Sequence, residues 1–291
     1  MFVKHLVLNN FRNHKNTDVA LAPGVVLLIG ENGHGKTNLV EAIRYASTLE
    51  SHRVAGYQAL IMAGEQSATI RALATHDGRD VILELELNRD SANRSRLNRA
   101  DLPKWRDVLG TVQSVTFAPE DLDIVKRDPS NRRAFIDELV IQVWPRFGGI
   151  YSDYDRVLRQ RNTLLRTARQ TGTRGTALST LDAWDASLVS YGSQIIEARA
   201  DLVGRLKPLL LKAYQEIAIA NNEPNILIKS SILGAQVSED DDADGMEFLE
   251  TADRAAIADA FEQKLAMVRA KELERGITLI GPHRDDLVLM L

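Results

Sequence analysis

The first part of the chain alternates short apolar runs with turn signals. Apolar and β-branched runs of this kind, bounded by Pro, Gly, Asn or Asp, are typical of strands. They cover residues 2–8, 17–21, 25–29, 68–74, 80–87 and 111–117. Ala22-Pro23-Gly24 and His76-Asp77-Gly78 predict turns between them. The pattern predicts a sheet with one helix over residues 38–49, where apolar side chains recur at three- and four-residue spacing.

From about residue 131 to residue 220 the pattern is almost wholly helical. A heptad-like seam runs from Leu181 to Leu202, and a shorter apolar stripe runs from Tyr151 to Ala168. The glycine-containing segment 172–176 separates the two stripes. The simplest interpretation is a helical hairpin. Both a protruding arm and a compact helical lobe would have this pattern, so the two alternatives stay open at this point.

Strand character returns toward the end of the chain. Pro208 predicts a kink or a restart of the helix, residues 225–233 a strand and residues 255–273 another helix. Residues 276–281 and 287–291 are again strand-like, and no internal repeat is evident. We therefore expect an α/β protein: a sheet domain formed by residues 1–130 and 276–291, with a mainly helical domain, residues 131–275, inserted into it.

Residues 30–37, Gly-Glu-Asn-Gly-His-Gly-Lys-Thr, match the phosphate-binding pattern G-x-x-x-x-G-K-[ST]. The match lies between a predicted strand and a predicted helix, which is the context that the motif requires. The alternative is a glycine-rich turn that merely joins a strand to a helix, and the context disfavours it. The residues predicted to bind the nucleotide are Gly30, Glu31, Asn32, Gly33, His34, Gly35, Lys36 and Thr37.

Physical chemistry assigns roles within this loop. The glycines permit backbone angles closed to other residues, so that backbone N–H groups can approach a phosphate at the start of a helix. Lys36 is expected to reach the outer phosphates as a point charge. The Thr37 hydroxyl is the predicted ligand of Mg²⁺.

Charge is segregated along the chain, although the net charge is only −4. Acidic residues gather between residues 239 and 253, which predicts a solvated loop. Three basic stretches comprise Arg156, Arg159, Arg161, Arg166, Arg169 and Arg174; Arg89, Arg94, Arg96, Arg99, Lys104 and Arg106; and Lys126, Arg127, Arg132 and Arg133. The six arginines of the first stretch could make phosphate contacts with a nucleic acid or could form a solvent-facing helix stripe. Both alternatives stay open, because no aromatic platform is interleaved with these arginines.

Composition narrows the class of protein. The chain has no cysteine, which excludes disulfides, thiolate catalysis and thiolate zinc sites and fits a reducing cytosol. The N-terminus lacks the apolar core of a signal peptide, and no apolar run approaches the length of a membrane span. We therefore expect a cytoplasmic protein with no membrane partner.

Three further patterns carry less weight. A hydrolytic P-loop enzyme needs an apolar strand that ends in Asp or Asp-Glu, but the nearest match, residues 134–138, continues at helical spacing and predicts a helix start. Residues 190–194 faintly resemble an ABC-type signature, yet Tyr191 is a core position of the heptad seam. The six histidines show no metal-ligand spacing.

Several segments together resemble one family, the SMC-like ABC ATPases, and within it the RecF family of bacterial recombination mediators. The resemblance spans nearly the whole chain, in order. Its segments are Asn10-Phe11-Arg12-Asn13, the loop continuing to Ala42, Ser51-His52-Arg53, residues 117–122, Asp128-Pro129 with Arg132-Arg133, residues 157–162 and Gly281-Pro282-His283-Arg284-Asp285-Asp286-Leu287.

The resemblance implies a P-loop ABC-type ATPase head that binds ATP and Mg²⁺. It further implies an ATP-dependent homodimer that acts as a gated clamp on gapped or double-stranded DNA, with RecO and RecR as partners in loading RecA. Such a protein would serve DNA replication, DNA repair and the SOS response to DNA damage. Arg12 and Asn13 are expected to approach the nucleotide as well, whereas the roles of residues 283–286 stay open.

In this family a signature motif and an acidic Walker B strand follow the segment 281–287. The chain as given ends at Leu291, so we expect ATP binding that is weak or retained and hydrolysis near background. Two rival interpretations remain. A small-molecule P-loop kinase could use the arginines between 156 and 174 as a lid, and a helical interaction module with a vestigial loop would bind neither ATP nor DNA.

Overall fold

The computed structural model describes residues 1–54, 56–126, 128–172, 179–218, 222–233, 247–249 and 253–291. The chain divides into two compact units, and each is considered by itself. Unit 1 comprises Met1–Asp121 and Ile141–Pro145, and unit 2 comprises Leu122–Val140 and Arg146–Leu291.

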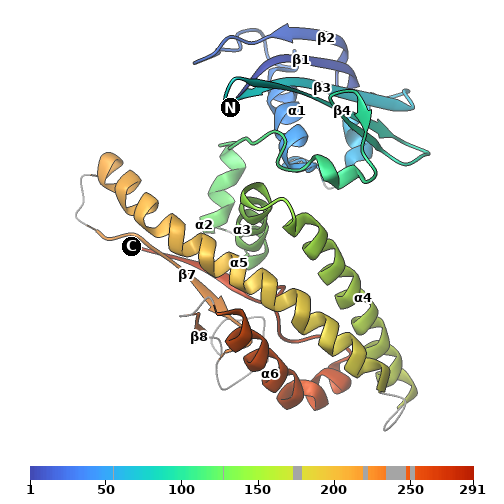
Figure 1. Ribbon diagram of the computed structural model, residues 1–291, viewed down its shortest axis with the longest axis vertical. Coiled ribbons are helices and arrows are strands. Elements are labelled where there is room, and N and C mark those ends of the chain that lie inside the picture. The colour runs from blue at the N-terminus through green and yellow to red at the C-terminus, as the bar shows by residue number, and fades with distance from the viewer. Residues whose placement is uncertain (55, 127, 173–178, 219–221, 234–246, 250–252) are drawn as a thin grey trace. The chain divides into compact units, whose positions relative to one another are not determined.

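Unit 1 is built on a six-stranded antiparallel sheet in the order β2-β1-β3-β4-β5-β6. The strands are β1 (Phe2–Phe11), β2 (His14–Ala20), β3 (Ser67–His76), β4 (Arg79–Asn88), β5 (Arg94–Leu97) and β6 (Ala100–Asp101). Buried and less buried side chains alternate along β3 and β4, so one face of the sheet is apolar. Helix α1 (Lys36–Thr48) lies against the sheet, and its Ala42, Tyr45 and Ala46 join the same core (Figure 1).

The β3–β4 hairpin shows how local sequence sets the register. Asp77 and Gly78 both have positive φ, 49° and 76°, as a two-residue hairpin turn requires. His76 consequently pairs with Arg79, and the buried apolar residues of the two strands face the core. Two short 3₁₀ helices, η1 (Tyr57–Leu60) and η2 (Trp105–Val108), pack beside the sheet core.

Two predicted strands of unit 1 were wrong. Residues 25–29 and 111–117 form no strand, and Val25, Leu27, Ile29, Val115 and Phe117 are 77–101% exposed. A buried parallel strand needs a neighbour on each side, and none of the described strands of the sheet pairs with either segment. An apolar run in the sequence does not show which neighbouring strand it would pair with, so the runs were mistaken for strands.

Unit 2 is mainly helical. Its helices are α2 (Asp123–Lys126), which follows η3 (Pro119–Leu122), α3 (Pro129–Val143), whose last turn belongs to unit 1, α4 (Phe147–Thr171), α5 (Ser179–Ile217) and α6 (Arg254–Arg275). Helices α4 and α5 lie side by side and run in opposite directions (Figure 1), which confirms the helical hairpin. Most of the predicted loop between them, residues 173–176, lies outside the described residues. Their apolar stripes meet α6 in one core that includes Leu188, Ile195 and Phe261.

A small sheet completes unit 2, in the order β8-β7-β9, with β7 (Asn225–Ser230), β8 (Glu247–Phe248) and β9 (Asp286–Met290). The contacts of β9 with β7 place residues 276–291 in unit 2, whereas the sequence analysis grouped them with the first domain. Residues 276–281 are not a strand, because their polar groups bond to side chains of α4 and α6 and to Ser231 instead of a strand partner. Helix α5 continues through Pro208, so the predicted restart was wrong.

The predicted acidic loop lies mostly outside the described residues. Of its members, Glu247 belongs to β8, and the Asp253 side chain caps the N-terminus of α6 by accepting from the Ala255 N–H at 3.1 Å.

Candidate functional site

The phosphate-loop segment leads directly into α1. Gly30, Gly33 and Gly35 have φ of 155°, 86° and 90°, which side chains rarely adopt. At Gly35 a Cβ would lie 2.6 Å from both Asn13 Oδ1 and His14 Nε2, so a side chain there would displace both groups from their contacts with the loop. The helix starts at the next residue, with its first free N–H groups at the end of the loop.

Lys36 is folded back over the loop. Its ammonium group donates to the carbonyl oxygens of Gly30 and Glu31, both at 2.7 Å. The ammonium group has three N–H donors. It can therefore exchange its hydrogen bonds to the two carbonyls for hydrogen bonds to an anion. Thr37 and the loop residues Glu31, Asn32, Gly33 and His34 are exposed, so an anion can reach the loop from solvent.

Side chains at the bend between β1 and β2 contact the backbone of the loop. Asn13 donates its amide to the Gly33 carbonyl at 3.1 Å and accepts from the Asn38 amide at 2.8 Å. A ring nitrogen of His14 lies 3.1 Å from the Gly35 carbonyl. Arg12 adopts φ of 53° at this bend, and its backbone N–H donates to the Leu60 carbonyl at 2.7 Å. The predicted site residue Asn13 is therefore in contact with the loop.

Glu41 is the buried hub behind the loop. Arg12 donates to both oxygens of this fully buried carboxylate, at 3.0 and 2.7 Å, and Ser51 donates at 2.5 Å. Arg53 lies 3.4 Å from the same carboxylate and donates to Asn38 Oδ1 at 2.8 Å. Burial alone would raise the pKa of Glu41, but the bonds from Arg12 and Ser51 and the nearby Arg53 hold it below its ordinary value. The carboxylate is therefore charged.

Sequence reasoning gave Arg12 to the nucleotide, whereas the structure gives most of its guanidinium to Glu41 and to the Ala59 carbonyl. It missed the roles of Glu41, Asn38 and Arg53. The available signal was a carboxylate on the buried stripe of a helix, beside Ala42 and Tyr45, which requires a cationic partner. The sequence did not indicate which arginine would provide it.

A hollow of about 530 Å³ opens beside the loop. Arg12, Arg53 and Arg89 give it positive charge, and Asn13 and Asn38 connect it to the loop. Ala59, Ile61 and Ala63 give it apolar walls. Arg89 is fixed by donation to the carbonyls of Glu65 at 2.8 Å and Ile61 at 3.2 Å. The arrangement combines a phosphate loop with a neighbouring positively charged hollow.

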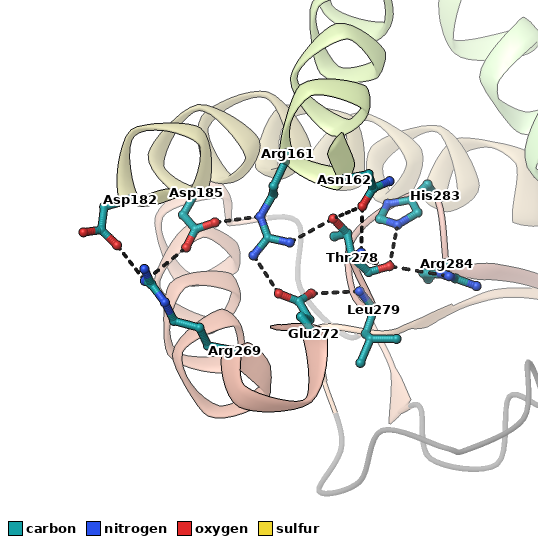
Figure 2. A network of polar contacts seen from close by, with 10 residues as sticks. All are labelled: Arg161, Asn162, Asp182, Asp185, Arg269, Glu272, Thr278, Leu279, His283 and Arg284. Atoms are coloured by element: carbon teal, nitrogen blue, oxygen red, sulfur yellow. Dashed lines mark hydrogen bonds and ion pairs between the residues drawn. The ribbon is translucent and has the colours of Figure 1, made fainter. Parts of the chain in front are cut away.

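The arginines of the first basic stretch differ in exposure: Arg156, Arg159, Arg166 and Arg169 of α4 are exposed, whereas Arg161 is not. Arg161 is fully buried and donates to Asp185, Glu272 and Thr278 at 2.6–2.8 Å (Figure 2). It is therefore excluded as a phosphate contact, because a buried, fully paired cation cannot reach a ligand. Arg169 donates to the Arg275 carbonyl at 3.0 Å, and Arg174 lies outside the described residues.

The segment 281–286 forms the interior of unit 2. His283 lies 2.7 Å from the Tyr154 hydroxyl, and Asp285 accepts from the Ser231 N–H at 2.7 Å and from the hydroxyls of Ser230 and Ser231. Burial lowers the pKa of His283 to about 3, so the ring is neutral. Arg132 binds Asp286 through two bonds of 2.8 and 2.9 Å, and Arg133 donates to the Asp285 carbonyl. These residues fix the fold of unit 2.

The Asp137 carboxylate, the nearest sequence match to an acidic metal motif, lies in the middle of α3. Residues 134–138 are helical as predicted, but the helix begins at Pro129 and not at this segment. Arg199 donates to both carboxylate oxygens of Asp137, at 2.7 and 2.8 Å, and Tyr151 donates at 2.5 Å. Among the described residues no group of three or more His, Asp or Glu side chains could hold a metal ion. The described ranges likewise hold no helix that is both long and apolar enough to cross a membrane.

Comparison with known proteins decides the family. An AAA domain family matches residues 5–227. The DNA replication and repair protein RecF of Clavibacter sepedonicus is 48% identical over 297 residues, which cover 100% of this chain and 72% of that protein. RecF of Streptomyces avermitilis is 45% identical over 294 residues, which cover 100% of this chain and 75% of that protein. The chain belongs to the RecF family. It spans about three quarters of the length of these RecF relatives.

Solved RecF structures agree with this result. The structure of the recombination mediator RecF with ATPrS, in the RecFOR pathway, has a TM-score of 0.87 at 27% identity and covers 99% of this chain and 73% of that one. A second RecF structure, with ATP, has a TM-score of 0.83. The fold is therefore the α/β P-loop ATPase fold of RecF, as the sequence analysis expected.

Proposed function

We propose that this chain is an ATP-binding DNA replication and repair protein. The observation that carries the proposal is the loop of residues 30–37 at the start of α1. Asn13 and His14 contact this loop, and the ammonium group of its Lys36 can donate to an anion. The RecF relatives are named for DNA replication and repair, and two solved RecF structures carry ATP or its analogue.

In this proposal the backbone N–H groups of residues 33–37 hold the nucleotide phosphates, and Lys36 exchanges its carbonyl bonds for the outer phosphates. The exposed Thr37 hydroxyl would hold Mg²⁺, which neutralises phosphate charge when bound. The apolar walls of the 530 Å³ hollow suit the nucleoside, with Arg12 held at its edge by Glu41.

The two solved RecF structures are described as RecF of the RecFOR pathway, and this supports a more specific proposal. ATP binding would drive formation of a homodimer that closes as a clamp on gapped or double-stranded DNA. RecR and RecO would then join it to load RecA in the cytoplasm. The kinase alternative is not favoured, because the relatives that match the whole chain are RecF proteins. One of the arginines between 156 and 174 that were expected to form its lid, Arg161, is also buried.

The test is fluorescence anisotropy of a labelled gapped duplex at low salt, with and without Mg-ATP. We expect binding that rises with ATP in the wild-type chain and in Lys15→Ala, an exposed lysine of β2, and no ATP response in Lys36→Ala. Sedimentation of the same samples should show the dimer only with ATP. DNA binding in all three proteins that ignores ATP would contradict the gated clamp.

A further inference from the structure

Unit 1 contains a second hollow, of about 670 Å³, at the C-terminal end of α1. This cup has an aromatic lining formed by Tyr45, Tyr57 and Trp105. Leu49 and Val54 add apolar wall. Its size is that of small-molecule sites, and three aromatic side chains converging on one hollow are the usual lining of such sites. The P-loop and the Glu41 hub do not use any of these three aromatic residues.

The rim of the cup is polar in a specific way. It carries the Glu50 carboxylate and the side-chain amides of Gln58 and Asn93. Asn93 Oδ1 already accepts from the Asn88 N–H at 2.9 Å, so the group that Asn93 offers to a ligand is its amide NH₂. Acceptors and donors around an aromatic slot match the hydrogen-bonding edge of a planar heterocycle.

Charge complementarity indicates what kind of heterocycle fits. Trp105 lies in the chain between Lys104 and Arg106, and both flanking side chains are exposed. Neither cation lines the cup itself, but exposed cationic side chains next to an aromatic residue suit a single strand, because cations follow the backbone while the ring stacks a base. The arginines between residues 156 and 174 have no aromatic residue interleaved with them in the sequence, so this is a different surface.

We propose that the cup binds an unstacked nucleobase of a DNA strand, with Tyr57 and Trp105 stacking the ring and Lys104 and Arg106 bordering the flanking phosphates. This inference rests on the proposed DNA-binding function and deepens it. Glu50 accepts from an exocyclic amino group, so cytosine and adenine bind better than thymine, which has none in that position. The site therefore recognises an unpaired base at a gap or junction rather than an intact duplex.

The first test is photocrosslinking with the full chain and a gapped duplex whose gap contains 5-iodocytosine. Mass spectrometry of the products should place the crosslink on Tyr57 or Trp105. A crosslink that falls only on unit 2, or no crosslink under conditions where the DNA is bound, would overturn the proposal. This readout does not depend on a variant's ability to fold.

The second test measures gapped-DNA affinity. Trp105→Leu and Tyr57→Leu should each weaken binding about 5- to 100-fold, as the loss of one base–aromatic stack does. Tyr57→Phe, which keeps the ring, should bind like wild type, and Glu50→Met should abolish the preference for a cytosine gap over a thymine gap. Wild-type affinity in both leucine variants would overturn the proposal.

Controls separate this inference from the proposed function. Binding of a fluorescent ATP analogue should be unchanged in the cup variants, because no cup residue that is changed belongs to the phosphate loop. If the wild-type chain binds gapped DNA but the leucine variants lose only RecO or RecR, the cup docks a protein side chain and the nucleobase proposal fails alone. If the wild-type chain binds no DNA, the proposed function and this inference fail together.

Discussion

Each unit of the molecule has a fully buried glutamate bound by an arginine, and the two pairs differ in what surrounds them. In unit 1, Arg12 binds Glu41 but keeps 17% of its side chain exposed beside the nucleotide hollow. In unit 2, Arg161 binds Glu272 with both side chains at 0% exposure, and Asp185 and Thr278 take its other donors (Figure 2). The same chemistry braces an open site in one unit and seals a core in the other.

The pKa values follow this difference. The pKa of Glu272 is raised, because its burial outweighs the bonds from Arg161 and from the Leu279 N–H. The pKa of Glu41 is lowered, because Arg12, Ser51 and Arg53 together outweigh burial. The Arg12–Glu41 pair thus differs from the Arg161–Glu272 pair in two ways. Its carboxylate has enough cationic and polar donors to lower its pKa, and its arginine borders a hollow.

The largest effect should come from breaking the sealed pair. Arg161→Met leaves the buried Glu272 without its cation and leaves Asp185 with only its 3.5 Å contact to Arg269, so we expect a loss of about 3–5 kcal/mol of unfolding free energy. Arg156→Met, an exposed arginine of the same helix, should change stability little. Urea denaturation measures both. Recovery of most of the loss in Arg161→Met/Glu272→Met would confirm the uncompensated charge as the cause, and equal stability of Arg161→Met and wild type would contradict a sealing role.

A smaller effect is expected at the braced site. Glu41→Gln keeps the shape but leaves Arg12 and Arg53 facing a neutral group, so stability should fall by about 1–3 kcal/mol and ATP affinity should weaken. Glu84→Gln, a carboxylate of β4 paired with Arg71, is the matched control.

The pH dependence of this variant has a definite sign. Because the folded pKa of Glu41 lies below 4.5, its ionic contribution is complete above pH 4.5 and is lost as the pH falls through the folded value. The stability difference between Glu41→Gln and wild type should therefore shrink in acid. A difference that does not change with pH would mean that charge is not what Glu41 contributes.

A neutral, partly buried histidine of unit 2 provides a further test. His283 has its pKa lowered from 6.5 to about 3, so the unfolded chain binds its proton first as the pH falls. Wild type should lose about 1.4 kcal/mol of stability per pH unit below pH 6.5 from this group alone. In His283→Gln that slope should disappear between about pH 5 and pH 6.5. Asp285, whose pKa is raised, acts in the opposite direction in both proteins and cancels in the difference.

The smallest effect lies at the edge of unit 2. Asp253→Ala removes the N-cap of α6 and should cost about 1 kcal/mol, while Asp259→Ala, exposed on the same helix, should cost less. Thermal unfolding of the two variants side by side measures the difference. An equal shift in both would show that the cap bond does not form in solution.

How far the sequence predicted these features depended on the range of the interaction. The hairpin turn at Asp77-Gly78, the helix after Lys36 and the α4–α5 hairpin follow local rules and were predicted. The strand predicted at residues 25–29 is absent from the structure. The prediction failed because an apolar run indicates burial but does not show the neighbour that a strand requires.

The candidate site divides in the same way. The loop of residues 30–37 was evident from its motif, since its spacing is local. The pairing of Arg12 with Glu41 joins residues 29 positions apart, and that of Arg161 with Glu272 joins residues 111 positions apart. Neither pairing produces a periodic pattern in the sequence. The sequence alone therefore does not distinguish an arginine that binds a ligand from one that pairs with a buried glutamate.

The short segment Ile141–Pro145 gives the order of synthesis a role in folding. It belongs to unit 1, where Gln113 donates to the Gln142 carbonyl at 2.9 Å and Pro145 packs onto Gly110. A ribosome releases Met1–Asp121 first, but that unit lacks this segment until residue 145 has left the exit tunnel. The nascent chain therefore makes residues 122–140, which belong to the second unit, before all of the first unit is available.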